Sequence, residues 1–495
     1  MINSSIDGVH VGTPSSVPGD SAADKARTYE TSADIKTTAT AVEPGANPEL
    51  VNHQKAHDNA YEILGKAVHP WELPLDLGIE EAGVYLEHLG VARYRMMEVF
   101  RDTTTLTLTD ADIAGEHLGL TPHTRRIIAG QAVNSLEQHW GFTASTFLNQ
   151  VRQVPLFLSA SGLSYLELLE LLDTAFVEGL TTAPNGTDPQ PIISREVEGD
   201  GCALEDMTLF PLGQSSPSTI EISKALDRVH RFLRLRRALR WSITDMDRAI
   251  TALQLGRHEN SFDVKLDDAF VVELSLVERL GKDLVLPLIE LLSWWAPIDT
   301  RTAAHAEKKA RKSLFERLFL DKSVMNPDDL SFQLLFAELT GGDLAPVAPI
   351  AEHAPRVLAA LRMSAPDLSL LTSSEVSQQV LHVPASEIAV EPVEGKTLLN
   401  LANLSQLHRI ASFARKLKLG IRDLLALKAV SEVDPFDLAH LENTRWFVER
   451  ARKVRASRFT IAEVDYLLRH VSQAPQASRR HPNASSCSST RSTAG

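Results

Sequence analysis

Helix-start signals recur along this chain, and they constrain its fold more than any other feature. Each signal places a hydroxyl residue three positions before a carboxylate and ahead of an apolar helical run, as in Thr109–Asp112, Ser164–Glu167, Ser242–Asp245 and Thr460–Glu463. In such a capping box the hydroxyl accepts from the third residue's amide, and the carboxylate reaches back to the first residue. Donors that a helix start leaves unpaired are thereby satisfied. The chain is therefore predicted to be all-α.

The spacing of these signals is irregular, which argues against a strict solenoid repeat. We expect an irregular array of packed helical hairpins, a helical shell, with disordered N- and C-terminal tails. Pro-, Gly- and Ser-rich stretches divide the chain. The expected units are a disordered arm (1–48), a helical lobe (49–180), an irregular insertion or linker (181–218), a second helical lobe (219–340), a loop-rich connection (341–394), helical hairpins (395–471) and a disordered tail (472–495).

Charge and cysteine content exclude several classes of protein. The formal net charge of -14 disfavours generic attraction to nucleic acid or to anionic lipid. The two cysteines, Cys202 and Cys487, lie in segments that read as irregular, so no disulfide framework is expected. The N-terminus lacks a basic stretch followed by an apolar one, so it does not resemble a secretion signal.

The most apolar stretch is too short and too interrupted to span a membrane. Within Leu284–Ile298 the apolar run is broken by Pro287 and Glu290, and a spanning helix needs about 18 apolar residues. We predict that Leu284–Trp295 is a central core helix, with an interface to a missing partner as the alternative.

No motif for catalysis, cofactor binding or metal binding is complete. Gly395-Lys396-Thr397 resembles the end of a phosphate-binding loop, but the earlier glycine position is Val390. His53 and His57 share a helix face without the glutamate of a zinc-protease motif or a nearby cysteine. A nucleophile elbow is absent from the sequence. We therefore expect no catalytic residue, no cofactor and no metal, and hence no enzyme.

The sharpest local pattern is a series of arginines at every third position, with Arg236 added, along a helix expected from Ile222 to Arg240. Its members are Arg228, Arg231, Arg234, Arg237 and Arg240. The favoured interpretation is that the helix buries Ile222, Leu226, Val229 and Leu233 while the arginines form inter-helix bridges to carboxylates. The candidate carboxylates are Asp227, Asp245, Asp247, Glu167, Glu170 and Asp173. A contact between subunits is the second interpretation, and nucleic acid or membrane binding is the third.

Several stretches together resemble the A component of Tc insecticidal toxin complexes, the virulence plasmid A protein family. Their order and approximate spacing along residues 51–471 are similar to that family. The stretches are Ala60–Leu64, His69–Val91 (HPWELPLDLGIEEAGVYLEHLGV), Arg93–Phe100, Leu163–Val177 (LSYLELLELLDTAFV), Cys202–Leu209, Asp227–Leu253 (DRVHRFLRLRRALRWSITDMDRAITAL) and Glu442–Val471.

The resemblance implies a segment of the N-terminal helical shell of a pentameric, receptor-binding translocation subunit that delivers a toxic enzyme. The family's partners are the toxin B and C components and a host-cell receptor, and its localisation is secreted or at the cell surface. The channel and the B-binding region have no counterpart here, which implies a truncated component. The family's shell has no catalytic residues to transfer to this chain. The host receptor and the target organism are not implied.

Three other functions compete with this expectation. A stand-alone helical interaction scaffold would be monomeric or dimeric and would have no toxin role. An enzyme would need polar groups that converge near Thr181–Ser218. A membrane-surface protein would use Leu284–Trp295.

Overall fold

The computed structural model describes fourteen stretches of the chain. They are residues 15–16, 27–28, 61–101, 108–132, 134–143, 146–178, 195–197, 204–209, 219–254, 265–302, 312–322, 329–343, 348–373 and 397–470. Most of the two predicted tails, His53, His57 and both cysteines lie outside these stretches, as does Gly395-Lys396.

The fold is all-α, as predicted, and its first half is built from short helices around one long helix, α11. After a helical stretch at residues 61–66 come α2 (Leu77–His88), α3 (Arg93–Phe100), α4 (Asp110–His117), α5 (Pro122–Ile128), α6 (Leu136–Trp140), α7 (Phe147–Val151), α8 (Val154–Ser161), α9 (Tyr165–Leu172), α10 (Ala175–Glu178), α11 (Thr219–Leu239), α12 (Ile243–Gln254), α13 (Asp268–Leu284) and α14 (Leu288–Leu292).

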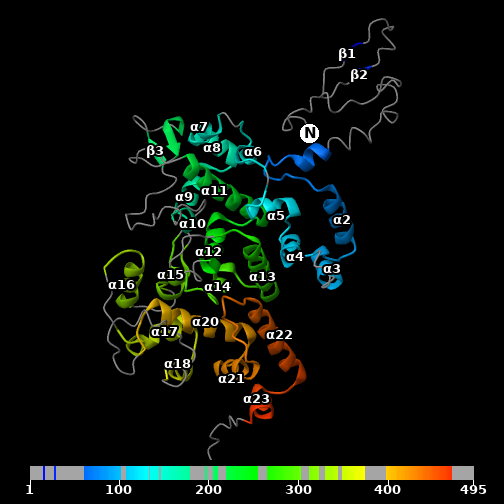
Figure 1. Ribbon diagram of the computed structural model, residues 1–495. Helices are drawn as coiled ribbons and strands as arrows, with labels where there is room; N and C mark the ends of the chain where they lie inside the picture. Colours follow the sequence, from blue (N-terminus) through cyan, green and yellow to red (C-terminus); the bar gives the residue numbers. More distant parts are fainter. Residues whose placement is uncertain are drawn as a thin grey trace, which may run out of the picture.

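The second half continues the helical array to the lower end of the molecule (Figure 1). Its elements are α15 (Leu314–Phe319), α16 (Leu330–Leu339), the 3-10 helix η6 (Ile350–His353), α17 (Ala354–Leu361), α18 (Ala365–Leu371), α20 (Leu401–Leu417), α21 (Ile421–Ser431), α22 (Glu442–Ser457) and α23 (Ile461–Arg469). The predicted connection 341–394 thus contains two α-helices whose Val357, Leu361 and Leu371 are buried, so part of it belongs to the core.

Strands within the described stretches form two small antiparallel pairs. One joins β1 (Ser15–Ser16) to β2 (Arg27–Thr28), and the other joins β3 (Arg195–Val197) to β4 (Met207–Leu209), which directly follows the 3-10 helix η4 (Leu204–Asp206). The second pair belongs to the predicted insertion 181–218. Its Leu209 amide donates 2.7 Å to the Arg152 carbonyl, which ties this hairpin to the helices α7 and α8.

Helix starts follow the capping chemistry that the sequence predicts. At α4, α9 and α23 both halves of the box are formed, by Thr109, Ser164 and Thr460 with the carboxylates three residues later. Ser242 accepts from the Asp245 amide at 3.1 Å ahead of α12. These contacts fix where the helices begin, and packing fixes how they are arranged.

A hydrophobic cluster runs continuously from α4 to α23. In α11, Leu226, Val229 and Leu233 are all fully buried, as predicted for three of the four residues, whereas the side chain of Ile222 is not described. Helices α11, α12 and α13 lie between the N-terminal helices and the α20–α23 end (Figure 1). The N-terminal and C-terminal halves of the described chain therefore share one core.

The predicted helix over Leu284–Trp295 is wrong in extent and right in burial. Helix α13 ends at Leu284, Val285 adopts a left-handed conformation (φ 51°), and Pro287 caps the five-residue α14. A proline cannot continue the preceding helix, because its ring clashes with the earlier carbonyl. Trp294 and Trp295 are nonetheless buried, and their indole N–H groups donate 3.0 Å to Ser412 and Thr444 in α20 and α22.

Arginine side chains repeatedly bind the carboxyl ends of other helices. Arg356 Nε donates 2.9 Å to the Phe319 carbonyl at the end of α15, and Arg409 donates 3.2 Å to the Ala296 carbonyl beyond α14. Similar bonds join Arg415 to Leu361, Arg450 to Ser431 and Arg455 to Leu417. The last carbonyls of a helix lack partners and carry partial negative charge, so a guanidinium satisfies both needs.

The helices α2 and α3 lie at the margin of the array, beside α4 (Figure 1). Neither helix has a buried residue. Their apolar side chains face solvent, with Tyr85 72%, Val99 75% and Phe100 78% exposed. No single described helix is long and apolar enough to cross a membrane, although one sharply bent pair, α8 with α9, passes that test by length and composition.

Candidate functional site

The arginine helix α11 meets the N-terminal stretch 68–74 at a buried joint. Arg234, 2% exposed, donates to three main-chain carbonyls: Val68 at 2.6 Å, Trp71 at 3.1 Å and Leu73 at 2.5 Å. The planar guanidinium presents several donors in a fixed fork, so one side chain can hold a whole turn of backbone. Burial lowers the pKa of Arg234 to about 10, and Arg237 adds to that effect.

Aromatic and histidine rings are stacked around this joint. Trp71 stacks on His230 with ring centroids 4.6 Å apart. His139 also stacks on His230, with ring centroids 5.0 Å apart. The Trp71 indole also donates 2.8 Å to the Ala160 carbonyl. Burial lowers the pKa of His139 to about 4 and lowers that of His230 well below its usual value, with Arg234 as the second cause. Both imidazoles are therefore neutral in the folded protein at pH 7.

Two further arginines of the series bind helix ends that finish in glycine. Arg237 lies over Trp71, 4.3 Å from the ring centroid, and donates to the Ser161 carbonyl at the end of α8. Arg231 donates 3.3 Å to the Ile128 carbonyl at the end of α5. The terminating residues Gly162 (φ 60°) and Gly130 (φ 71°) have positive φ, and a Cβ on either would lie 3.0 Å from the arginine Nη atom. Only glycine suits both the backbone and the approach.

The other arginines have more varied surroundings. Arg236 pairs with Glu167 at 2.5 Å, and Arg231 also pairs with Asp227 at 2.9 Å. Arg228 lies 5.1 Å from the centroid of the Phe176 ring. Arg240 is exposed and ends the helix with φ 56°.

The contacts match the predicted carboxylate bridges only in part. Glu167 forms the predicted kind of inter-helix pair with Arg236, Asp227 pairs with Arg231 within α11, and Arg231, Arg234 and Arg237 also bind main-chain carbonyls. Asp247 accepts from the amides of Ala175 and Phe176, 3.0 and 2.8 Å away, and so caps α10. The predicted contact between subunits remains a prediction.

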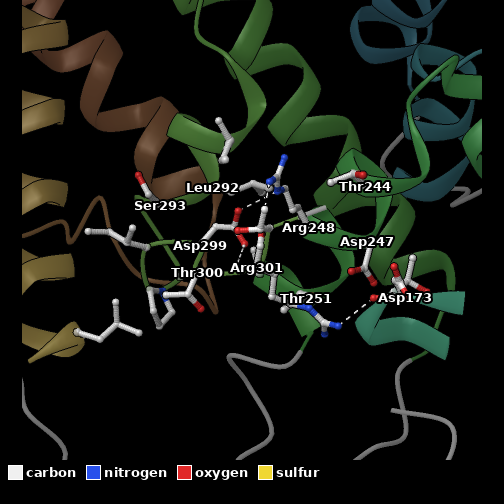
Figure 2. Close-up of a pocket in the computed structure, with 18 of the residues that line it drawn as sticks. Asp173, Thr244, Asp247, Arg248, Thr251, Leu292, Ser293, Asp299, Thr300 and Arg301 are labelled. Atoms are coloured by element: carbon white, nitrogen blue, oxygen red, sulfur yellow. Dashed lines mark hydrogen bonds and ion pairs between the residues drawn. The ribbon is translucent and has the colours of Figure 1, made fainter. Parts of the chain in front are cut away.

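Beyond the arginine helix, a cavity of about 370 Å³ opens between α9 and the turn after it, α12, α14 and residues 296–302 (Figure 2). Its polar wall holds the carboxylates Glu170, Asp173, Asp247 and Asp299 with the guanidinium groups of Arg248 and Arg301. Its apolar wall is formed by Ala252, Ile289, Leu292, Ala296, Pro297, Ile298 and Leu401.

Hydrogen bonds fix the cavity wall. Arg248 Nε donates 2.9 Å to Asp299, and Arg301 donates 2.9 Å to the Asp173 carbonyl (Figure 2). Burial raises the pKa of Asp247 and of Asp299, against the opposing influence of their hydrogen-bond donors. The cavity offers hydrogen-bond acceptors beside an apolar surface. Its carboxylates come from three separate segments, namely α9 with its C-cap, α12 and the 296–302 loop, so no sequence spacing could have indicated the cavity.

Among the described residues, no cluster of His, Cys, Asp or Glu has the arrangement needed to hold a metal ion. The histidine stack has parallel rings, and such rings do not aim their nitrogens at a common point. One hydroxyl–imidazole pair touches the cavity, because the lining residue Ser293 has its hydroxyl oxygen 3.3 Å from Nδ1 of the buried His408. The joint around Arg234 positions α11 relative to the stretch 68–74.

Comparisons with known proteins give likenesses in structure but none in sequence. No family model matches the sequence, and no curated protein matches it. A cryo-electron microscopy structure of Morganella morganii TcdA4 is similar over 84% of this chain and 21% of that chain, at 11% sequence identity and a TM-score of 0.49. This chain thus spans about a fifth of the length of that protein. A likeness this distant assigns neither a family nor an activity.

Proposed function

We propose that this chain is a non-enzymatic structural segment of the helical shell of a Tc toxin A component. In that role it would contribute to a pentameric, receptor-binding subunit that delivers a toxic enzyme into host cells. The resemblance of residues 51–471 to that family motivates the proposal, and one observation of the structure carries it. Two stretches that bear the resemblance, His69–Val91 and Asp227–Leu253, meet in the buried joint around Arg234.

The joint supports a scaffolding role because its rings and guanidinium groups pack against one another away from solvent. Arg234 donates hydrogen bonds to main-chain carbonyls, and the Trp71 ring contacts both His230 and Arg237. The His230 imidazole is neutral and buried. Groups that bind substrate must instead reach a cleft that substrate can enter. Rigid helix junctions of this kind suit a shell that has to keep its shape.

The exposed apolar faces of α2 and α3 favour a place in a larger assembly over the rival of a stand-alone scaffold. Tyr85, Val99 and Phe100 are each more than two thirds exposed, and a monomer rarely leaves several such groups together in water. A second copy of the chain, as the pentamer of the family implies, would cover them.

Light scattering coupled to size-exclusion chromatography tests the proposal on the full chain. We expect self-association, and we expect the double variant Tyr85→Asp/Phe100→Asp to be monomeric with unchanged helicity by circular dichroism. Leu330→Asp is the matched control, because Leu330 is also exposed (64%) but lies on α16. A parent chain that stays monomeric over the accessible concentration range would refute the assembly role and favour the stand-alone scaffold.

A further inference from the structure

The cavity between α9, α12 and α14 has one polar and one apolar wall, which is the composition of a small-molecule site. Ligand pockets combine a mostly apolar lining with a few placed polar groups, and their volumes begin at about 300 Å³. This cavity, at about 370 Å³, has room for a ligand the size of a small aliphatic or aromatic molecule. Thr244, Asp247 and Asp173 are seen at the right of Figure 2, and Leu292, Ser293 and Asp299 at the left.

The charge of the lining selects against anions. It contains four carboxylates and two guanidinium groups. The guanidinium of Arg248 is held by Asp299, and that of Arg301 donates to the Asp173 carbonyl. The charge of Arg248 is therefore paired within the wall, and carboxylates outnumber guanidinium groups in the lining.

One carboxylate of the wall, that of Glu170, accepts hydrogen bonds from the described part of the chain through only one of its two oxygens. Glu170 is only 8% exposed, and its Oε1 atom accepts from the Thr244 amide at 3.0 Å and from the Thr244 hydroxyl. Among the described residues, no donor reaches its other oxygen, Oε2. The carboxylate therefore presents an acceptor that a cationic donor in the cavity can use.

We propose that this cavity binds an amphipathic organic cation, an ammonium group carried on a short aliphatic or aromatic body. The ammonium group takes Glu170 Oε2 as its principal acceptor, with the cavity's remaining carboxylates supplying negative potential. The apolar body lies against Leu292, Ile298 and Leu401. This inference is independent of the shell role proposed above.

Three six-carbon probes that differ in their head groups test the proposal by isothermal titration calorimetry on the full chain. Hexylamine should bind saturably with one site per chain, while 1-hexanol should bind at least about tenfold more weakly and hexanoate should not bind. Glu170→Gln should weaken hexylamine binding about tenfold, since the amide keeps an acceptor for Thr244 but loses the charge.

Thr251→Leu places apolar bulk in the cavity from α12 and should abolish binding, even if Glu170→Gln fails to fold. Glu87→Gln, on the exposed face of α2, is the matched control and should bind like the parent. Circular dichroism checks the fold of each variant. Absence of saturable hexylamine binding, equal binding of hexanol and hexylamine, or binding indifferent to the cavity substitutions would each overturn the proposal.

Discussion

Replacing Arg234 by methionine tests whether the buried joint organises the N-terminal lobe. Methionine has a similar length but removes three charge-assisted hydrogen bonds to the Val68, Trp71 and Leu73 carbonyls. Bonds of this kind contribute about 1.5–3 kcal/mol each, and part of that gain is offset by the desolvation that lowers the pKa of Arg234 to about 10. The three carbonyls would also lose their donor. We expect a net loss of about 3 kcal/mol in the free energy of unfolding.

Urea denaturation followed by tryptophan fluorescence is the appropriate assay, because Trp71 and Trp140 lie at the joint with ring centroids 5.6 Å apart. These two of the six tryptophans report the joint, the other four report the rest of the fold, and far-UV circular dichroism reports total helix content. If the joint holds the lobe, the fluorescence transition of Arg234→Met should move to lower urea than the parent transition.

Two further variants separate the effect of the forked guanidinium donors of Arg234 from the effect of its positive charge. Arg234→Lys keeps the charge but cannot donate in a fork to three carbonyls, so we expect a loss of about 1–2 kcal/mol. Arg240→Met alters an exposed arginine of the same helix and should change the free energy by less than about 0.5 kcal/mol. The reasoning fails if Arg234→Met unfolds within about 1 kcal/mol of the parent.

Acidification from pH 6.5 to 4 should lower the unfolding free energy, because the unfolded chain protonates histidine near 6.5 while burial holds the folded pKa of His139 and His408 at about 4. In urea titrations of the double variant His139→Gln/His408→Gln, the unfolding free energy should fall less steeply with falling pH than in the parent. The same steepness in both proteins would contradict the role of these histidines. Asp247→Ala should cost about 1–2 kcal/mol by uncapping α10, measured by thermal unfolding. Gly162→Ala (φ 60°) should destabilise by about 1 kcal/mol or more, whereas Gly83→Ala, in open space, should not.

The helical class and the helix starts could be predicted from sequence because they depend on local chemistry. A hydroxyl and a carboxylate three positions apart satisfy amides of their own turn, so Ser164 and Thr460 identify α9 and α23 without tertiary information. The burial of Leu226, Val229 and Leu233 likewise follows from their spacing on one helix face. The helix predicted across Pro287 failed where apolar composition was given more weight than the proline.

The arginine partners and the cavity were decided by tertiary structure. The sequence shows a series of arginines from Arg228 to Arg240, but it could not show that Arg234 binds carbonyls 161 to 166 residues away while Asp247 caps another helix. A carboxylate is a visible partner in a sequence, whereas every residue has a carbonyl. Which carbonyls lack a donor depends on where helices end and meet. Local chemistry therefore determined the elements, and packing determined what their charged groups do.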